Sequence, residues 1–183
     1  MPSSEVPVRA LVVYESLFGN AETIARAIAR GLATQLPAEA VPAAGAPETV
    51  GRDVALLVVG GPNHAMAMPR PSTREDAVNR GAQVSSPHTG LREWLGRVQF
   101  EAGGTHVGAF DTRMDHPRFL TRLDHAARTE EKLLGAHGGA SIAPAEHFLV
   151  LDTTGPLAPG EEQRAEEWGA RLGARALAAV TAG

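Results

Sequence analysis

V-V-Y-E-S-L-F-G-N-A-E-T-I-A-R-A-I-A-R-G, residues Val12–Gly31, is the stretch of sequence that decides the fold. Its first residues complete an apolar, β-branched run that starts at Val8 and is typical of a fully buried strand. From Ala21 to Leu36 the apolar residues recur every three or four positions, which predicts an amphipathic helix. A buried strand that leads directly into a helix is the first half of a βαβ unit, so the sequence indicates a parallel sheet.

The rest of the chain repeats this alternation of strands and helices. We expect one domain over residues 1–183, with a five-stranded parallel sheet and helices on both of its faces. Ligands of such doubly wound sheets bind at the carboxyl ends of the strands. The expected strands are Val8–Tyr14, Ala38–Ala43, Asp53–Gly60, Thr105–Phe110 and Glu146–Leu151, and the main helices are Ala21–Leu36, Leu91–Val98, Leu123–Leu134 and Pro159–Val180.

A long, proline-containing segment, Gly61–Gly90, interrupts the alternation. Within it, Ser72–Glu75 has the spacing of a capping box and predicts a short helix from Thr73 to about Arg80. Thr89 is placed to cap the helix that follows. A loop of this length inside a compact domain is more often functional or mobile than idle.

Composition excludes several classes of protein. The chain has no cysteine, 17 basic and 21 acidic residues, and a net charge of −4. It therefore holds no disulfide, thiolate metal site or iron–sulfur cluster, and its histidines lack zinc-binding spacing. Without a basic cluster, nucleic acid is not expected as the main partner. There is no apolar run of membrane-spanning length, and Met1–Pro7 does not resemble a secretory signal, so we expect a cytoplasmic protein.

The loop Glu15–Asn20 has the chemistry of an anion site. Unpaired N–H groups of the first helical turn and the helix dipole attract an anion, and Gly19 allows the backbone to approach an oxygen closely. Ser16 and Asn20 add neutral hydrogen bonds. No lysine or arginine lies between Glu15 and Glu22, which argues against a P-loop triphosphatase, and the dinucleotide motif G-x-G-x-x-G is absent. A monophosphate fits the loop; a plain turn with an Asn cap is the alternative.

Val12–Gly31 resembles the FMN phosphate-binding segment of the flavodoxin superfamily. It is most similar to the branch with an S-x-[FY]-G loop, which includes flavodoxin-like NAD(P)H:quinone oxidoreductases. Gly60–His64 (G-G-P-N-H) resembles the second flavin loop of the family. The resemblance implies the strand order 2-1-3-4-5 and FMN as the cofactor. It also implies the cofactor-binding residues, which are Ser16, Leu17, Phe18, Gly19, Asn20, Ala21, Gly61, Pro62, Asn63, His64, Ala65, Asp111, Thr112 and Arg113.

The last three of these residues are expected in a loop after the fourth strand, beside the pyrimidine edge of the flavin. This sequence departs from the family at Ala21, where a threonine is usual, and the loop 111–118 lacks both the glycine run and a stacking aromatic residue. Glu22 either complements the helix dipole or opposes the phosphate charge.

Three functions follow from the resemblance. The first is an FMN protein that carries electrons between partner proteins. The second is an FMN-dependent enzyme that uses NAD(P)H and a quinone, and the third is a flavin-free interaction module. No catalytic residue and no metal ligand is predicted for any of them.

Overall fold

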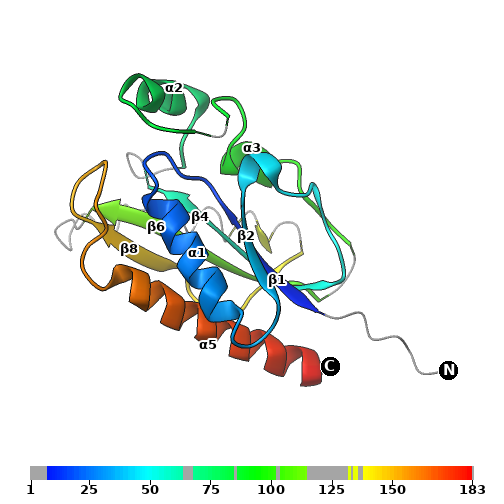
Figure 1. The fold of residues 1–183 in the computed structure, drawn as a ribbon. Helices are drawn as coiled ribbons and strands as arrows, with labels where there is room; N and C mark the ends of the chain where they lie inside the picture. The colour runs from blue at the N-terminus through cyan, green and yellow to red at the C-terminus, as the bar shows by residue number, and fades with distance from the viewer. Residues whose placement is uncertain are drawn as a thin grey trace.

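The computed structural model describes residues 8–63, 68–84, 86–101, 104–114, 132, 134, 135 and 138–182. These form three layers around a parallel sheet (Figure 1). Helices α1 (Asn20–Leu32) and α5 (Glu161–Ala182) pack on one face of the sheet, and α3 (Leu91–Leu95) packs on the other. None of the described helices has both the length and the apolar character needed to cross a bilayer.

The sheet has the predicted strand order. Strands β2 (Ala38–Pro42), β1 (Arg9–Tyr14), β4 (Val54–Pro62) and β6 (His106–Met114) lie side by side and parallel. The fifth position is divided, because β7 (Ala140–Ser141) pairs with the start of β6 and β8 (Glu146–Val150) pairs with its end. The order 2-1-3-4-5 is therefore confirmed, with the fifth strand in two pieces. A separate two-stranded sheet joins β3 (Thr49–Val50) to β5 (Gln99–Phe100), and a short 3-10 helix, η1 (Ala43–Gly45), follows β2.

Helices α1 and α5 approach each other closely through glycines. A Cβ atom added to Gly169 would lie 2.2 Å from the carbonyl oxygen of Ile28, and one added to Gly31 would lie 1.9 Å from that of Glu166. Real Cβ atoms do not approach backbone this closely, so only glycine fits at these crossings. This contact fixes where α1 begins relative to the sheet, and the start of α1 forms part of the candidate site.

The predicted helix in the segment Gly61–Gly90 is confirmed as α2 (Pro71–Asn79), which stands over the carboxyl end of the sheet (Figure 1). Its predicted cap is wrong. The helix starts one residue before Ser72, with Pro71 in its first turn and no side-chain cap, because the fixed φ of proline suits that position.

Two other helix predictions have different outcomes. Thr89 does not cap α3; Gly90 precedes the helix, and its N–H donates to Oε2 of Glu93 at 2.9 Å. The acidic side chain three residues on thus caps the turn in place of the threonine hydroxyl. The helix predicted at Leu123–Leu134 falls largely outside the described residues.

Candidate functional site

The loop between β1 and α1 is closed by its own short contacts. Gly19 precedes the helix with a φ of +89°, a left-handed conformation that favours glycine. Its N–H donates to Oγ of Ser16 at 3.1 Å, and its carbonyl accepts a hydrogen bond of 3.0 Å from the Thr23 hydroxyl. The Asn cap considered above is not formed, since Asn20 is already the first helical residue and no side chain caps the turn.

The first turn of α1 presents unused N–H donors. The first N–H groups of a helix have no partner inside the helix. Among the described residues, no acceptor bonds the backbone N–H groups of Asn20, Ala21 and Glu22. With the positive end of the helix dipole, such donors have the chemistry to hold an anion at the carboxyl end of the sheet.

A hollow of about 560 Å³ lies beside the loop Ser16–Gly19 and the first turn of α1. Ser16, Leu17, Phe18, Gly19 and Glu22 line one side, and Gly81, Ala82, Gln83, Val84 and Thr154 line the rest. None of these lining residues is a lysine or an arginine. An anion in the hollow would therefore meet neutral donors and the helix dipole.

Two of the predicted loop residues do not line the hollow with their side chains. The side chain of Asn20 lies against the loop between β8 and α5. A Cβ atom added to Gly155 in that loop would be 2.6 Å from the Oδ1 atom of Asn20. Ala21 is buried in the interior. Neither residue lines the hollow; their backbone N–H groups, which have no acceptor among the described residues, lie beside it in the first turn of α1.

Behind the loop, a buried ion-pair network joins it to the inserted segment. Glu15 is 7% exposed and Arg74, on α2, is 1% exposed. Nε of Arg74 donates to Oε1 of Glu15 at 2.5 Å, and its Nη2 lies 2.8 Å from Oε2 of Glu93 on α3. The backbone N–H of Leu91 also donates to Glu15, at 2.8 Å. The network therefore ties three separate segments together beneath the loop Glu15–Asn20.

Arg74 also changes the acidity of its neighbour. Burial alone would raise the pKa of Glu93, but the hydrogen bonds from Arg74 and from the N–H of Gly90 outweigh it, so this pKa lies below its ordinary value. Glu93 is therefore ionised at neutral pH. This network is not evident from the sequence, because Arg74 lies in a polar segment whose pattern is typical of an exposed helix.

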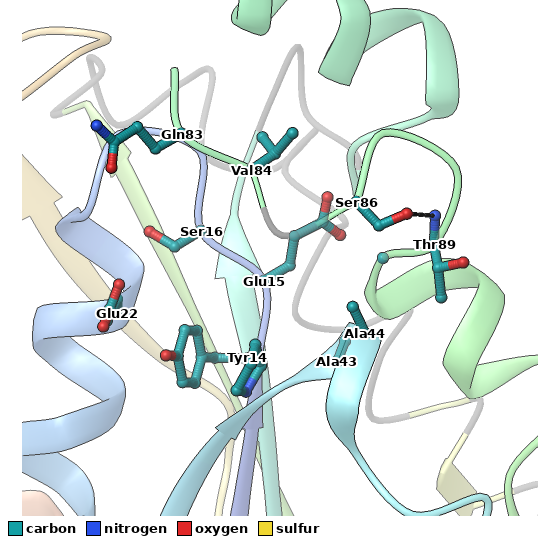
Figure 2. Close-up of a pocket in the computed structure, with 12 residues that line it drawn as sticks. Tyr14, Glu15, Ser16, Glu22, Ala43, Ala44, Gln83, Val84, Ser86 and Thr89 are labelled. Atoms are coloured by element: carbon teal, nitrogen blue, oxygen red, sulfur yellow. Dashed lines mark hydrogen bonds between the residues drawn. The ribbon is translucent and has the colours of Figure 1, made fainter.

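A smaller cavity lies beside the loop, between the end of β1 and Gln83, Val84, Ser86, Thr89 and Gly90 (Figure 2). Its volume is about 50 Å³, which is room for a few water molecules at most. Burial, and next the charge of Glu22, raise the pKa of the Tyr14 hydroxyl on its wall. Glu22 itself pairs with Arg26 at 2.8 Å, one turn further along α1. The cavity is too small for a cofactor, but it shows how closely the inserted segment packs here.

The second predicted loop starts beside the first. Gly61 and Pro62 are the last residues of β4, and the N–H of Asn63 donates to the carbonyl of Thr112 at 2.9 Å. A Cβ atom on Gly61 would lie 3.3 Å from the carbonyl oxygen of Glu15. The two segments that resemble flavin loops are therefore adjacent at one end of the sheet. His64 and Ala65 lie outside the described residues.

The prediction that Asp111, Thr112 and Arg113 form a loop is wrong. Strand β6 continues to Met114, since Asp111 and Thr112 pair with β4, and all three residues pair with β8. Pairing on both sides keeps these polar residues in the sheet, where single-sequence patterns favour a loop. Their contact with a flavin stays a prediction.

The side chain of Asp111 is directed into the protein and is 1% exposed. Its Oδ1 atom lies 3.0 Å from Nδ1 of His147 on β8 and 3.4 Å from Nε of Arg113. Both contacts involve Oδ1, whereas Oδ2 of Asp111 is buried without a hydrogen-bond partner among the described residues.

The layers, the strand order and the loop at the carboxyl end define the class as a flavodoxin-like α/β fold, and solved structures bear this out. The chain is similar to a flavodoxin from the domain Archaea, with a TM-score of 0.63 and 15% identity over 92% of this chain and 99% of that one. It is also similar to a flavodoxin from Streptococcus pneumoniae, with a TM-score of 0.60 and 12% identity over 92% and 99% of the two chains. A WrbA-like flavodoxin protein from Agrobacterium tumefaciens gives a TM-score of 0.55 and 16% identity over 92% and 97%.

At these identities the likeness establishes the fold alone. No protein-family model and no curated protein sequence matches the chain. The resemblance that the two motifs carry is therefore supported at the level of architecture, and function depends on the site itself.

Proposed function

We propose that this protein binds FMN and carries electrons between partner proteins. The observation that carries the proposal is the start of α1, where the N–H groups of Asn20, Ala21 and Glu22 have no acceptor among the described residues and a hollow without a lysine or arginine in its wall lies beside them. A monophosphate ester fits this arrangement, because amide donors and the helix dipole compensate its charge. A triphosphate with its metal ion would require the lysine that this loop lacks.

The residues present fit the cofactor. Gly19 has the left-handed conformation that the loop requires, and a Cβ atom there would meet no described atom within 4 Å, so the approach to its backbone is open. FMN supplies the redox chemistry when bound, and the protein supplies binding and orientation. We assign the phosphoryl end to Ser16–Ala21 and the ring to the ends of β4 and β6, at Gly61–Ala65 and Asp111–Arg113.

The carrier role is favoured over an NAD(P)H:quinone oxidoreductase. The enzyme hypothesis places the inserted segment over a substrate beside the flavin ring. Its described part instead borders the hollow at Ser16–Gly19 and pairs with Glu15 through Arg74. Net negative charge favours docking to basic patches on redox partner proteins.

The test is an absorbance spectrum of purified protein after FMN is added, followed by steady-state NAD(P)H oxidation in the presence of a quinone. We expect a bound-flavin spectrum and almost no turnover until a separate reductase is supplied. Rapid turnover without a reductase would support the enzyme. A protein that stays colourless would support a flavin-free interaction module.

Gly19 offers a variant with a matched control at Gly160. Both glycines immediately precede a helix, have φ values of +89° and +85°, and would place a Cβ atom in open space. Each accepts a hydrogen bond from the residue four positions on. Alanine in this conformation costs about 1–2 kcal/mol at either site.

We expect Gly19→Ala and Gly160→Ala to lower stability similarly, and only Gly19→Ala to weaken FMN binding, by about tenfold or more, because the loop donors then shift. Fluorescence titration with FMN measures both variants. Equal FMN affinity in the two variants would contradict the assignment of the phosphate to this loop.

A further inference from the structure

We infer that residues Gly81–Val84 of the inserted segment form a second wall of the phosphate site. In this inference Gln83 contacts the cofactor, and its side-chain amide donates to the phosphoryl group. The inference rests on the proposed function and extends it. It assigns part of the cofactor site to a segment that neither flavin-loop motif includes.

The first support is the shape of the hollow. The inserted segment faces Ser16–Gly19 across it, and both line the same space. Figure 2 shows Gln83 on the side of its segment that faces Ser16 and the start of α1. Gln83 is exposed, and among the described residues nothing hydrogen-bonds its side chain or the backbone N–H groups of Gln83 and Val84. The hollow therefore has amide donors on two opposite sides.

The second support is that the wall is anchored. Helix α2 ends in a closed turn, in which Gly81 has a φ of +88° and donates to Val78 at 2.9 Å, and Ala82 donates to Ala77 at 2.9 Å. This turn directs the chain from the end of α2 toward the phosphate loop. Within the same helix, Arg74 forms the buried pair with Glu15 of that loop. Arg74 is thus a positioning residue, which fixes the distance between the two walls.

The third support is the charge balance. A phosphate monoester carries nearly two negative charges, and the carboxylate of Glu22 already lies in the wall of the hollow. Because this wall contains no cation, each additional neutral donor contributes to binding. The two N–H groups of a glutamine amide are suited to phosphoryl oxygens, whereas a glutamate at the same place would repel them.

The inference is tested with Gln83→Glu, a change that preserves the size of the side chain and adds one negative charge. Gln99→Glu is the control, because Gln99 is also exposed but lies on β5, outside the hollow. FMN and riboflavin affinities are measured for the wild type and both variants by quenching of flavin fluorescence. Riboflavin lacks the phosphate, so it reports any effect that does not involve that group.

We expect Gln83→Glu to weaken FMN binding by about tenfold or more, since the repulsion between like charges at short range near a surface is worth at least that factor. Riboflavin affinity should change less than about twofold, and Gln99→Glu should leave both affinities unchanged. Unchanged FMN affinity in Gln83→Glu would overturn the inference, as would equal losses for FMN and riboflavin. If the wild type binds no FMN, the proposed function itself fails, which is a separate result.

Discussion

Replacing Arg74 by methionine should destabilise the protein strongly, because the change leaves a carboxylate buried without its cation. Arg74 is 1% exposed and its Nε atom lies 2.5 Å from Glu15, which is itself 7% exposed. Removal of one partner from a buried ion pair costs about 3–5 kcal/mol, a large part of the roughly 5–15 kcal/mol that stabilises a typical domain. Methionine retains much of the buried apolar volume, so most of the loss reflects charge.

Two comparison variants isolate the cause. Arg97→Met breaks a pair with Glu48 at 3.4 Å, in which both side chains are more than half exposed, and should cost no more than about 1 kcal/mol. Adding Glu15→Gln to Arg74→Met removes the buried charge, so the double variant should recover about 1–3 kcal/mol.

The assay is urea unfolding followed by circular dichroism, with free energies extrapolated to water. If Arg74→Met lost no more stability than Arg97→Met, the buried network would not hold the inserted segment on the phosphate loop. If the double variant recovered nothing, the loss would come from packing and the electrostatic explanation would be wrong.

Two further predictions concern the rest of the fold. Gly169→Ala should lower the free energy of unfolding in urea by about 1–3 kcal/mol, because the new Cβ atom would lie 2.2 Å from the carbonyl oxygen of Ile28. Gly96→Ala is the control and should be nearly neutral, since its Cβ atom would have no neighbour closer than 3.5 Å. Equal effects would contradict the close contact between α1 and α5. Burial raises the pKa of Glu161, but hydrogen bonds from Arg164 and a backbone N–H outweigh it, so its folded pKa lies below the ordinary value of 4.5. A group whose pKa is lowered by folding stabilises the protein at pH values above its unfolded pKa, and this contribution is lost as the pH falls through the folded pKa. Glu161→Gln should therefore weaken the dependence of stability on pH below about pH 4.5. An unchanged profile of stability against pH would refute this.

The features that the sequence predicted best are those set by local patterns. A continuous apolar run predicts strand β1, and apolar residues spaced three or four apart predict helix α1. Because the two patterns do not overlap in the sequence, the turn between them could be located to within about one residue. Gly19 was found because a helix start that accepts an anion needs a residue without a Cβ atom at its entry.

The features that the sequence missed depend on distant partners. Strand β6 continues through Asp111–Arg113 because β4 and β8 pair with it on both sides, and no local pattern records that pairing. Arg74 lies in a polar helix, and only its contact with Glu15, 59 positions away, shows that it is buried. Gln83 gives no signal at all until the fold brings it opposite Ser16.

Isothermal titration of the wild-type protein with FMN and with riboflavin is the most direct test of a lysine-free phosphate site. If amide donors at the start of α1 hold the phosphoryl group, FMN should bind at least about a hundredfold more tightly than riboflavin, a difference of about 2.7 kcal/mol. Equal affinities for the two flavins would show that this loop binds no phosphate, whatever the fold.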